Sequence, residues 1–246
     1  MQAALDYQPL DAAPERNAFV ALAGFNAPAG NNFMQVGMEN IRRFRAGHAP
    51  QREPLPLAFA HATPCHVKEA YDSLAKLHAD AKKIRRFSAE NQEMVRRYRL
   101  MQAMPNYINR LASSFGGETD FLRYRDVRCV SETLFAEAIL EIEEGRATQG
   151  LDFIEKDLAF YRRIFASAEA TLLDKRVALQ HIEQQLTLVG FLIEQDALRG
   201  HEEKARLLLA PLDAPRAHLL EALERERIDW RIQKVSATTS ILLIQP

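Results

Sequence analysis

The side chains best suited to metal chemistry gather in the segment 61–66, His-Ala-Thr-Pro-Cys-His. The imidazole nitrogens of His61 and His66 and the thiolate of Cys65 are ligand types that zinc prefers, but a structural zinc site takes four ligands. No second pair of Cys or His follows at a fitting spacing. We therefore interpret the segment as a loop without a metal, and the sequence predicts neither a metal site nor a cofactor.

The motifs of the common enzyme classes are missing as well. His181 and Glu183 are neighbours on an expected helix but lie on different faces, and no HExxH pair is present. Gly116 and Gly117 fit a turn and lack the patterns that cradle phosphate, and there is no GxSxG elbow. Residues 124–128, Tyr-Arg-Asp-Val-Arg, could line a polar cleft, although a surface ion-pair cluster is the favoured interpretation. The sequence predicts no catalytic residue and favours a protein without enzymatic activity.

Positive charge is concentrated in one part of a nearly neutral chain. The net charge is -1, yet residues 39–110 hold 14 Lys and Arg against 7 Asp and Glu. The candidate residues for binding an anion or a protein partner are the basic cluster on two consecutive expected helices and the tyrosine within it: Lys82, Lys83, Arg85, Arg86, Arg96, Arg97 and Tyr98. In this hypothesis the tyrosine stacks on a base or ring, whereas the alternative is a solvated basic face.

Two functions of different classes follow from these observations. The first is a non-enzymatic helical scaffold, a protein-interaction module that binds a protein partner through an apolar groove or a charged face. The second is an anionic-ligand or nucleic-acid binder that uses the basic cluster. Acidic flanking sequence and the lack of a recognition helix disfavour nucleic acid. The two hypotheses differ in salt dependence, because phosphate-driven binding weakens steeply as salt rises. The sequence identifies neither the partner nor the oligomeric state.

The elements that position these residues are indicated by apolar side chains repeating every seven residues, which fall on one stripe of a helix. Three such segments occur, and their repeating positions are Val67, Leu74 and Ala81 with Ala70, Leu77 and Ile84; Leu151, Leu158 and Phe165 with Ile154 and Tyr161; and Leu172, Leu179, Leu186 and Ile193 with Ile182 and Val189. We expect each stripe to face the core. The last two helices should form an antiparallel hairpin, with Thr171 and Asp174 as a capping box for the second.

The predicted fold class is all-α, a helical-hairpin bundle, because alternating β-branched residues with a hairpin turn are missing outside residues 238–244. Further helices are expected at 89–103, 106–114, 131–144, 202–210, 214–226 and 228–242, with Asn17 capping another at 18–23. Residues 131–158 have the spacing of small and large residues of a tetratricopeptide helix pair, in Leu134, Ala138, Gly145, Gly150 and Ile154. No second copy follows, which favours a bundle over a repeat array.

The distribution of Pro and Gly suggests two parts. Residues 1–64 hold most of them and are predicted to be a loop-rich segment with short helices packed on the main domain, and residues 65–246 form the helical domain. No transmembrane segment is predicted. Cys65 and Cys129 are compatible with one disulfide or with two free thiols. The apolar residues 241–244 are expected to complete the core or to form an interface.

Three segments carry a resemblance to a known group of proteins. They are residues 17–28, Asn-Ala-Phe-Val-Ala-Leu-Ala-Gly-Phe-Asn-Ala-Pro; residues 97–107, Arg-Tyr-Arg-Leu-Met-Gln-Ala-Met-Pro-Asn-Tyr; and residues 157–163 followed by 173–175. The chain resembles a group of uncharacterised helical proteins of proteobacteria. In that group an N-terminal membrane anchor or signal usually precedes the corresponding region, and the chain usually continues further. The resemblance implies a periplasmic location if such a signal has been removed, with a cytoplasmic location otherwise, and it implies no activity.

Overall fold

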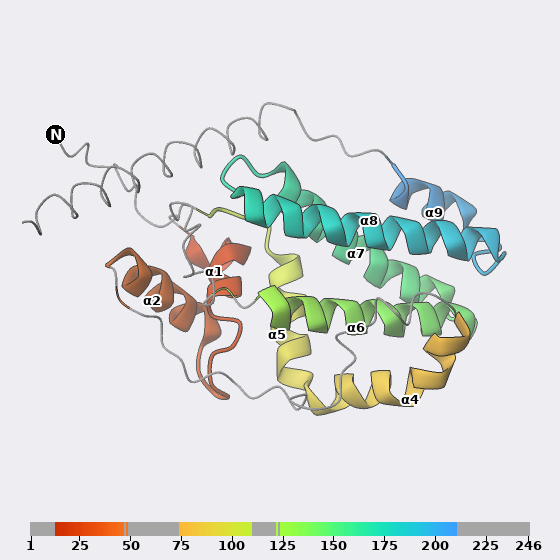
Figure 1. Cartoon of the computed structure of the whole chain (residues 1–246), viewed down its shortest axis with the longest axis horizontal. Coiled ribbons are helices and arrows are strands. Elements are labelled where there is room, and N and C mark those ends of the chain that lie inside the picture. The colour runs from red at the N-terminus through yellow and green to blue at the C-terminus, as the bar shows by residue number, and fades with distance from the viewer. Residues whose placement is uncertain (1–12, 47, 49–73, 110–121, 123, 211–246) are drawn as a thin grey trace, which may run out of the picture.

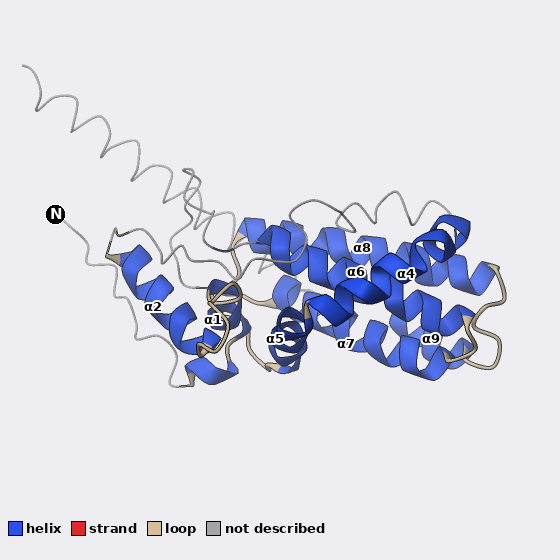
Figure 2. Cartoon of the chain, turned by 90° about the horizontal axis from the view of Figure 1, so that it is seen from below, coloured by secondary structure: helices blue, strands red, loops and turns tan. Residues whose placement is uncertain are grey.

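The computed structural model describes residues 13–46, 48, 74–109, 122 and 124–210 (Figure 1). Its elements are η1 (Pro14–Arg16), α1 (Ala18–Ala23), α2 (Phe33–Arg45), α4 (Leu74–Glu90), α5 (Gln92–Ala103), α6 (Tyr124–Glu143), α7 (Ala147–Ala166), α8 (Leu172–Glu194) and α9 (Glu202–Leu208). These ranges contain helices and no strand, as Figure 2 shows. The predicted all-α class is confirmed.

The long helices α6, α7 and α8 run along the longest dimension of the molecule, and consecutive members pack against each other (Figure 1). Helix α4 packs on α6, and α9 packs on both α7 and α8. Helix α5 runs across this layer and contacts α1, α6 and α7, so it joins the long helices to the α1–α2 pair (Figures 1 and 2). The core is continuous through these contacts.

Two of the predicted helix starts have the expected caps. The Asn17 side chain accepts a hydrogen bond from the Phe19 amide at 3.0 Å, which begins α1. Thr171 and Asp174 form the predicted capping box at the start of α8, in which each side chain accepts from the other's backbone amide. These caps satisfy amides that the first helical turn leaves without partners.

The helix predicted at 106–114 is wrong over its described part, because residues 106–109 are not helical. The backbone there pairs with the start of α1: the Ala18 amide donates to the Asn106 carbonyl at 2.9 Å, and the Asn17 side chain donates to the Ile108 carbonyl at 3.0 Å. These long-range partners replace the hydrogen bonds that a helix would supply. Residues 110–114 lie outside the described part.

Helices α6 and α7 approach each other closely where small residues meet. A Cβ on Gly150 would lie 2.4 Å from the Ala138 carbonyl oxygen and 2.6 Å from the Ile142 side chain. Gly145, with φ of +83°, provides the left-handed turn between the two helices. The small residues of the tetratricopeptide-like pattern therefore make this one helix pair tight.

The apolar stripes differ in burial. Leu77 and Ile84 on α4 and Leu151 and Leu158 on α7 are buried, as predicted. The third stripe, on α8, does not face the core as predicted: Leu179 is 43% exposed and Ile193 is 39% exposed, with Leu172 and Leu186 half-buried. The supporting Ile182 and Val189 are fully buried. The centre of the core face is therefore rotated away from the heptad positions, which lie at its edge.

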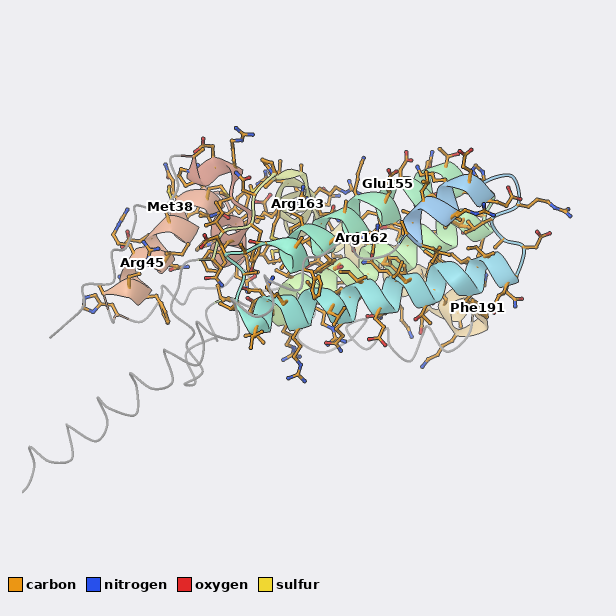
Figure 3. The ribbon with its side chains drawn as sticks, turned by 90° about the horizontal axis from the view of Figure 1, so that it is seen from above. Met38, Arg45, Glu155, Arg162, Arg163 and Phe191 are labelled. Atoms are coloured by element: carbon orange, nitrogen blue, oxygen red, sulfur yellow. The ribbon has the colours of Figure 1, made fainter. Side chains whose placement is uncertain are left out.

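An arginine helps to hold α9 to α7, in addition to the ion pairs of Lys204 on α9 with Asp152 and Glu155 on α7. The Arg162 Nη2 atom donates to the carbonyl oxygens of Leu208 and Ala210, both at 2.7 Å (Figure 3). These carbonyls belong to the end of α9, where helical partners run out. The guanidinium therefore caps α9 from the neighbouring helix.

Three sequence predictions concern the chain ends and the cysteines. Cys129 on α6 is disulfide-bonded and 1% exposed, whereas Cys65 lies outside the described residues. The helices predicted at 214–226 and 228–242 and the apolar residues 241–244 also lie outside them. In the described ranges, every helix is too short or too polar to cross a membrane.

Candidate functional site

The basic cluster predicted from the sequence divides into exposed and buried residues. On α4, Lys82, Lys83, Arg85 and Arg86 are all exposed. Three of them have a carboxylate partner: Lys83 contacts Asp80 at 2.6 Å, Arg86 contacts Glu90 at 2.6 Å, and Arg85 contacts Glu144, the residue after α6. Lys82 has no ion pair among the described residues.

The members of the cluster on α5 lie in two environments. Arg96 is exposed and makes two hydrogen bonds to the Glu93 carboxylate, at 2.7 and 2.8 Å. Arg97 is fully buried and donates to Glu93 and to the backbone carbonyls of Phe25, Ala27 and Pro28. Tyr98 is fully buried as well. It is therefore not at the surface to stack on a ligand.

The basic residues of the cluster lie on two helices that run across each other. Figure 1 shows α5 running across the direction of α4, and Figure 2 shows it nearly end-on. The carboxylates lower the net positive charge at each exposed position except Lys82, and the paired arginines hold the pKa of Glu93 near 2, well below its usual value. The structure thus brings together local ion pairs rather than a continuous cationic surface.

A buried polar cluster on four helices was not predicted. We call it the Asp157 cluster; it consists of Asp157 on α7, Tyr98 and Gln102 on α5, Ser131 on α6 and Gln185 on α8. The Asp157 carboxylate is fully buried and accepts a hydrogen bond from each of the other four side chains, including the Tyr98 hydroxyl at 2.5 Å and the Ser131 hydroxyl at 3.2 Å. The cluster therefore links α5, α6, α7 and α8 at one point.

The environment of Asp157 sets its proton affinity. Burial raises the pKa of the carboxyl to about 6, although the four hydrogen bonds favour the charged form. The Tyr98 hydroxyl has its pKa raised by burial and by the carboxylate beside it. A pKa near 6 would suit a general acid or base, but that role requires access to a substrate. Full burial and four internal donors leave Asp157 a structural acceptor.

A second buried carboxylate lies at the start of α8. The Asp174 side chain accepts from the Tyr107 hydroxyl and the Asn109 amide, each at 2.7 Å, from the Tyr124 hydroxyl and from Thr171. Burial and the charge of Asp174 raise the pKa of both tyrosines, so the hydroxyls remain protonated donors. The carboxylate thus fixes the capping box of α8 to the segment between α5 and α6 and to the first residue of α6.

A small cavity borders this carboxylate. Among the residues that line it are Tyr107, Tyr124, Arg128, Tyr161 and His181, which face it with apolar atoms. The space open to a water-sized molecule is about 20 Å³, which is enough for about one water. Small-molecule pockets are on the order of ten times larger or more. The cavity size therefore argues against a substrate or cofactor site here.

His181 is the other titratable group on the inner face of α8. Its ring stacks on Tyr161 with 4.2 Å between centroids and 4° between planes. Burial lowers the pKa of the imidazole to about 3, and the charge of Arg128 acts in the same direction. The imidazole is therefore neutral near pH 7 and belongs to the packed interior.

The outer edge of α8 has the opposite character. We define the α8 stripe as Leu172, Leu179, Leu186 and Ile193, the heptad positions at the edge of the core face. Beside it, along one outer flank of the helix, lie Arg176, Glu183, Gly190 and Glu194. The three charged members are exposed and have no ion pair among the described residues. This is an aliphatic edge beside unneutralised charges.

Gly190 lies within this flank, inside a long helix. A glycine there costs about 0.5–1 kcal/mol relative to alanine, and a Cβ at this position would meet nothing within 4 Å. Packing among the described residues therefore gives no reason for the glycine, unlike at Gly150. The heptad spacing alone predicts that the α8 stripe faces the core. The polar residues Asp174, His181 and Gln185 at helical spacing are the sequence signal for a polar interior beside it.

The described ranges contain no group of His, Cys, Asp and Glu that could hold a metal ion. Comparison with known proteins gives no match among family models, curated proteins or solved structures.

Proposed function

We propose that this chain is a protein-interaction module that binds an amphipathic helix of another polypeptide along the α8 stripe. The observation that carries the proposal is the exposure of Leu179 and Ile193 on one line of a helix whose inner face is fully occupied. Exposed aliphatic side chains at heptad spacing are the pattern with which a helix packs against another helix.

The charges on the outer flank define the chemistry of the partner. Arg176 near one end of α8 would pair with a carboxylate of the partner, and Glu194 at the other end would pair with a positively charged side chain of the partner. Gly190 leaves room for a side chain of the partner or for a close helix approach. The partner helix therefore has an apolar heptad stripe with opposite charges at its two ends.

Internal use of the polar groups supports a binding function over a catalytic one. The carboxylates of Asp157 and Asp174 are buried and accept hydrogen bonds from other side chains of the fold. The cavity beside Asp174 has room for about one water. The alternative of an anion binder has weaker support, because Arg85, Arg86 and Arg96 each contact a carboxylate.

Selection of helical peptides tests the proposal. A displayed library of amphipathic helices is selected on the full chain, and selected peptides are measured by fluorescence anisotropy. We expect the double variant Leu179→Gln, Ile193→Gln to weaken peptide binding by about tenfold or more, because both anchors become polar. Leu207→Gln on α9 is the matched control, since Leu207 is 68% exposed and lies off α8.

Equal binding of the selected peptides to the wild-type chain and the double variant would contradict the proposal, as would failure to select any helix. A peptide that loses affinity equally with Leu207→Gln would contradict it too, because the binding surface would then extend beyond α8.

A further inference from the structure

The partner helix that best matches the α8 stripe is α8 itself. We infer that two copies of the chain pair through antiparallel α8 helices, with a two-fold axis beside Leu186; this inference rests on the proposed function. The first support is the spacing of the apolar residues. Leu179 and Ile193 lie one heptad before and after Leu186. A two-fold axis at Leu186 therefore places Leu179 opposite Ile193 of the partner subunit, and the reverse.

The second support is the placement of the charges. Arg176 and Glu194 lie on the same outer flank of α8, about 15 Å and about 12 Å to either side of Leu186 along the helix. A two-fold axis perpendicular to both helices brings the same flanks of the two copies together. Arg176 then lies within side-chain reach of Glu194 of the partner subunit, and symmetry makes this ion pair twice.

Within one copy these charges cannot neutralise each other. They are about 27 Å apart on a single helix. Each is exposed, and neither has an ion pair among the described residues. Opposite charges placed on the two sides of an apolar centre are the arrangement that makes a surface complementary to itself.

The third support is Gly190. In the same pairing it lies opposite Glu183 of the partner subunit, because the two residues are nearly equidistant from Leu186. The missing side chain leaves space for the glutamate and for a close approach of the helices. Gly190, which has no packing role among the described residues of one copy, thus has a packing role where the two α8 helices meet.

A charge swap tests the pairing. Sedimentation equilibrium of the full chain, from dilute to concentrated solution, should show a monomer–dimer equilibrium. Arg176→Glu and Glu194→Arg should each raise the dimer dissociation constant by about tenfold, because two attractive contacts become repulsive. The double variant Arg176→Glu, Glu194→Arg should restore it to within about threefold, since only pairing between copies can bring these positions together. Lys82→Glu on α4 is the matched control and should change nothing.

Several outcomes would overturn the inference. A monomer at every concentration, with helical peptides still selected on the α8 stripe, would overturn the second copy as the occupant and leave the proposed function standing. A dimer that the double variant fails to rescue would overturn the antiparallel register. If the full chain is monomeric and a chain truncated after Ala210 forms dimers, the C-terminal segment of the same chain, rather than a second copy, covers the α8 stripe. A monomer that selects no peptide would contradict both proposals.

Discussion

The two edges of α8 reverse the usual distribution of side chains. The inner edge buries Asp174, His181 and Gln185, while the outer edge leaves Leu179 and Ile193 well exposed to solvent. The polar residues are stable inside because each contacts a side chain from elsewhere in the chain: tyrosine hydroxyls for Asp174, the Tyr161 ring for His181 and the Asp157 carboxylate for Gln185. Burial of a side chain on this helix therefore depends on the available hydrogen-bonding and stacking partners as well as on hydropathy.

The inner edge also explains how the layer is held in register. Hydrogen bonds to Asp157 require α5, α6, α7 and α8 to meet at one point, whereas aliphatic packing tolerates small shifts. The outer edge imposes no such requirement within the chain. Variants of the two edges should therefore differ in both the size and the kind of their effects.

The largest effect is expected at Asp157 of α7, the carboxylate to which Gln185 on the inner edge donates. Asp157→Ala leaves four buried donors without their acceptor, and we expect a loss of about 3–5 kcal/mol in the free energy of unfolding, measured by urea denaturation. Asp157→Asn should cost less, because the Gln185 Oε1 atom has no hydrogen-bond partner and rotation of that amide supplies an acceptor. Equal losses in the two variants would contradict this account.

The next prediction compares the loss of stability at a buried and at an exposed position of α8. Ile182→Ala should cost about 2–5 kcal/mol of unfolding free energy, because Ile182 is fully buried. Leu179→Gln, one turn away, should change it by about 0.5 kcal/mol or less in dilute solution, as expected for an exposed position. Thermal and urea denaturation measure both. A large loss in Leu179→Gln would place the α8 stripe in the core after all.

A third effect is the pH dependence of the inner edge. His181 has a folded-state pKa of about 3, below its unfolded value of about 6.5, so its stabilising contribution is present above pH 6.5 and is lost as the pH falls toward 3. From about pH 7 to about pH 5 the loss is about 2 kcal/mol.

Asp157 opposes this loss. Its folded-state pKa of about 6 lies above its unfolded value, so acidification from pH 6 toward 4 favours the folded state. Because the shift of His181 is the larger, the wild-type chain should lose stability on acidification over this range. His181→Leu should reduce or reverse the loss when unfolding free energies are compared at the two pH values. An unchanged pH profile in the variant would show that other groups control it.

The smallest effect has the opposite sign. Gly190→Ala should raise the unfolding free energy of the monomer by about 0.4–1 kcal/mol, because alanine favours the helix and its Cβ meets nothing within 4 Å. The same change should weaken pairing of α8 helices. Thermal melts of dilute protein measure the first effect and sedimentation equilibrium the second. Destabilisation of the dilute monomer would mean that Gly190 is constrained within the chain.

Much of the helical architecture could be predicted from the sequence. The seven-residue repeats located α4, α7 and α8, and the Thr171–Asp174 spacing located the start of α8, because these signals depend on residues close together in the chain. The same repeats did not locate the core face of α8. A stripe of leucines at the edge of a buried face has the same spacing as one at its centre, and only the packing of α7 and α9 against α8 distinguishes them.

The candidate site was less predictable for a related reason. The run of basic residues gave no sign that Arg97 would be surrounded by the carbonyls of Phe25, Ala27 and Pro28, which lie far away in the sequence. Nor did it show that Tyr98 would donate to Asp157. Charge density along the chain records composition, whereas the partners of each charge depend on tertiary contacts.

The contact of Arg162 with the end of α9 has a mechanical consequence. Tension applied to the chain beyond Ala210 first loads the two hydrogen bonds from the α7 guanidinium to the carbonyls of Leu208 and Ala210. The pull is thereby transmitted directly to α7, in the middle of the helical layer, before the α8–α9 turn can straighten. Together with the ion pairs of Lys204 to Asp152 and Glu155 on α7, the Arg162 contact thus directs a pull on the C-terminal end into α7 rather than into α8.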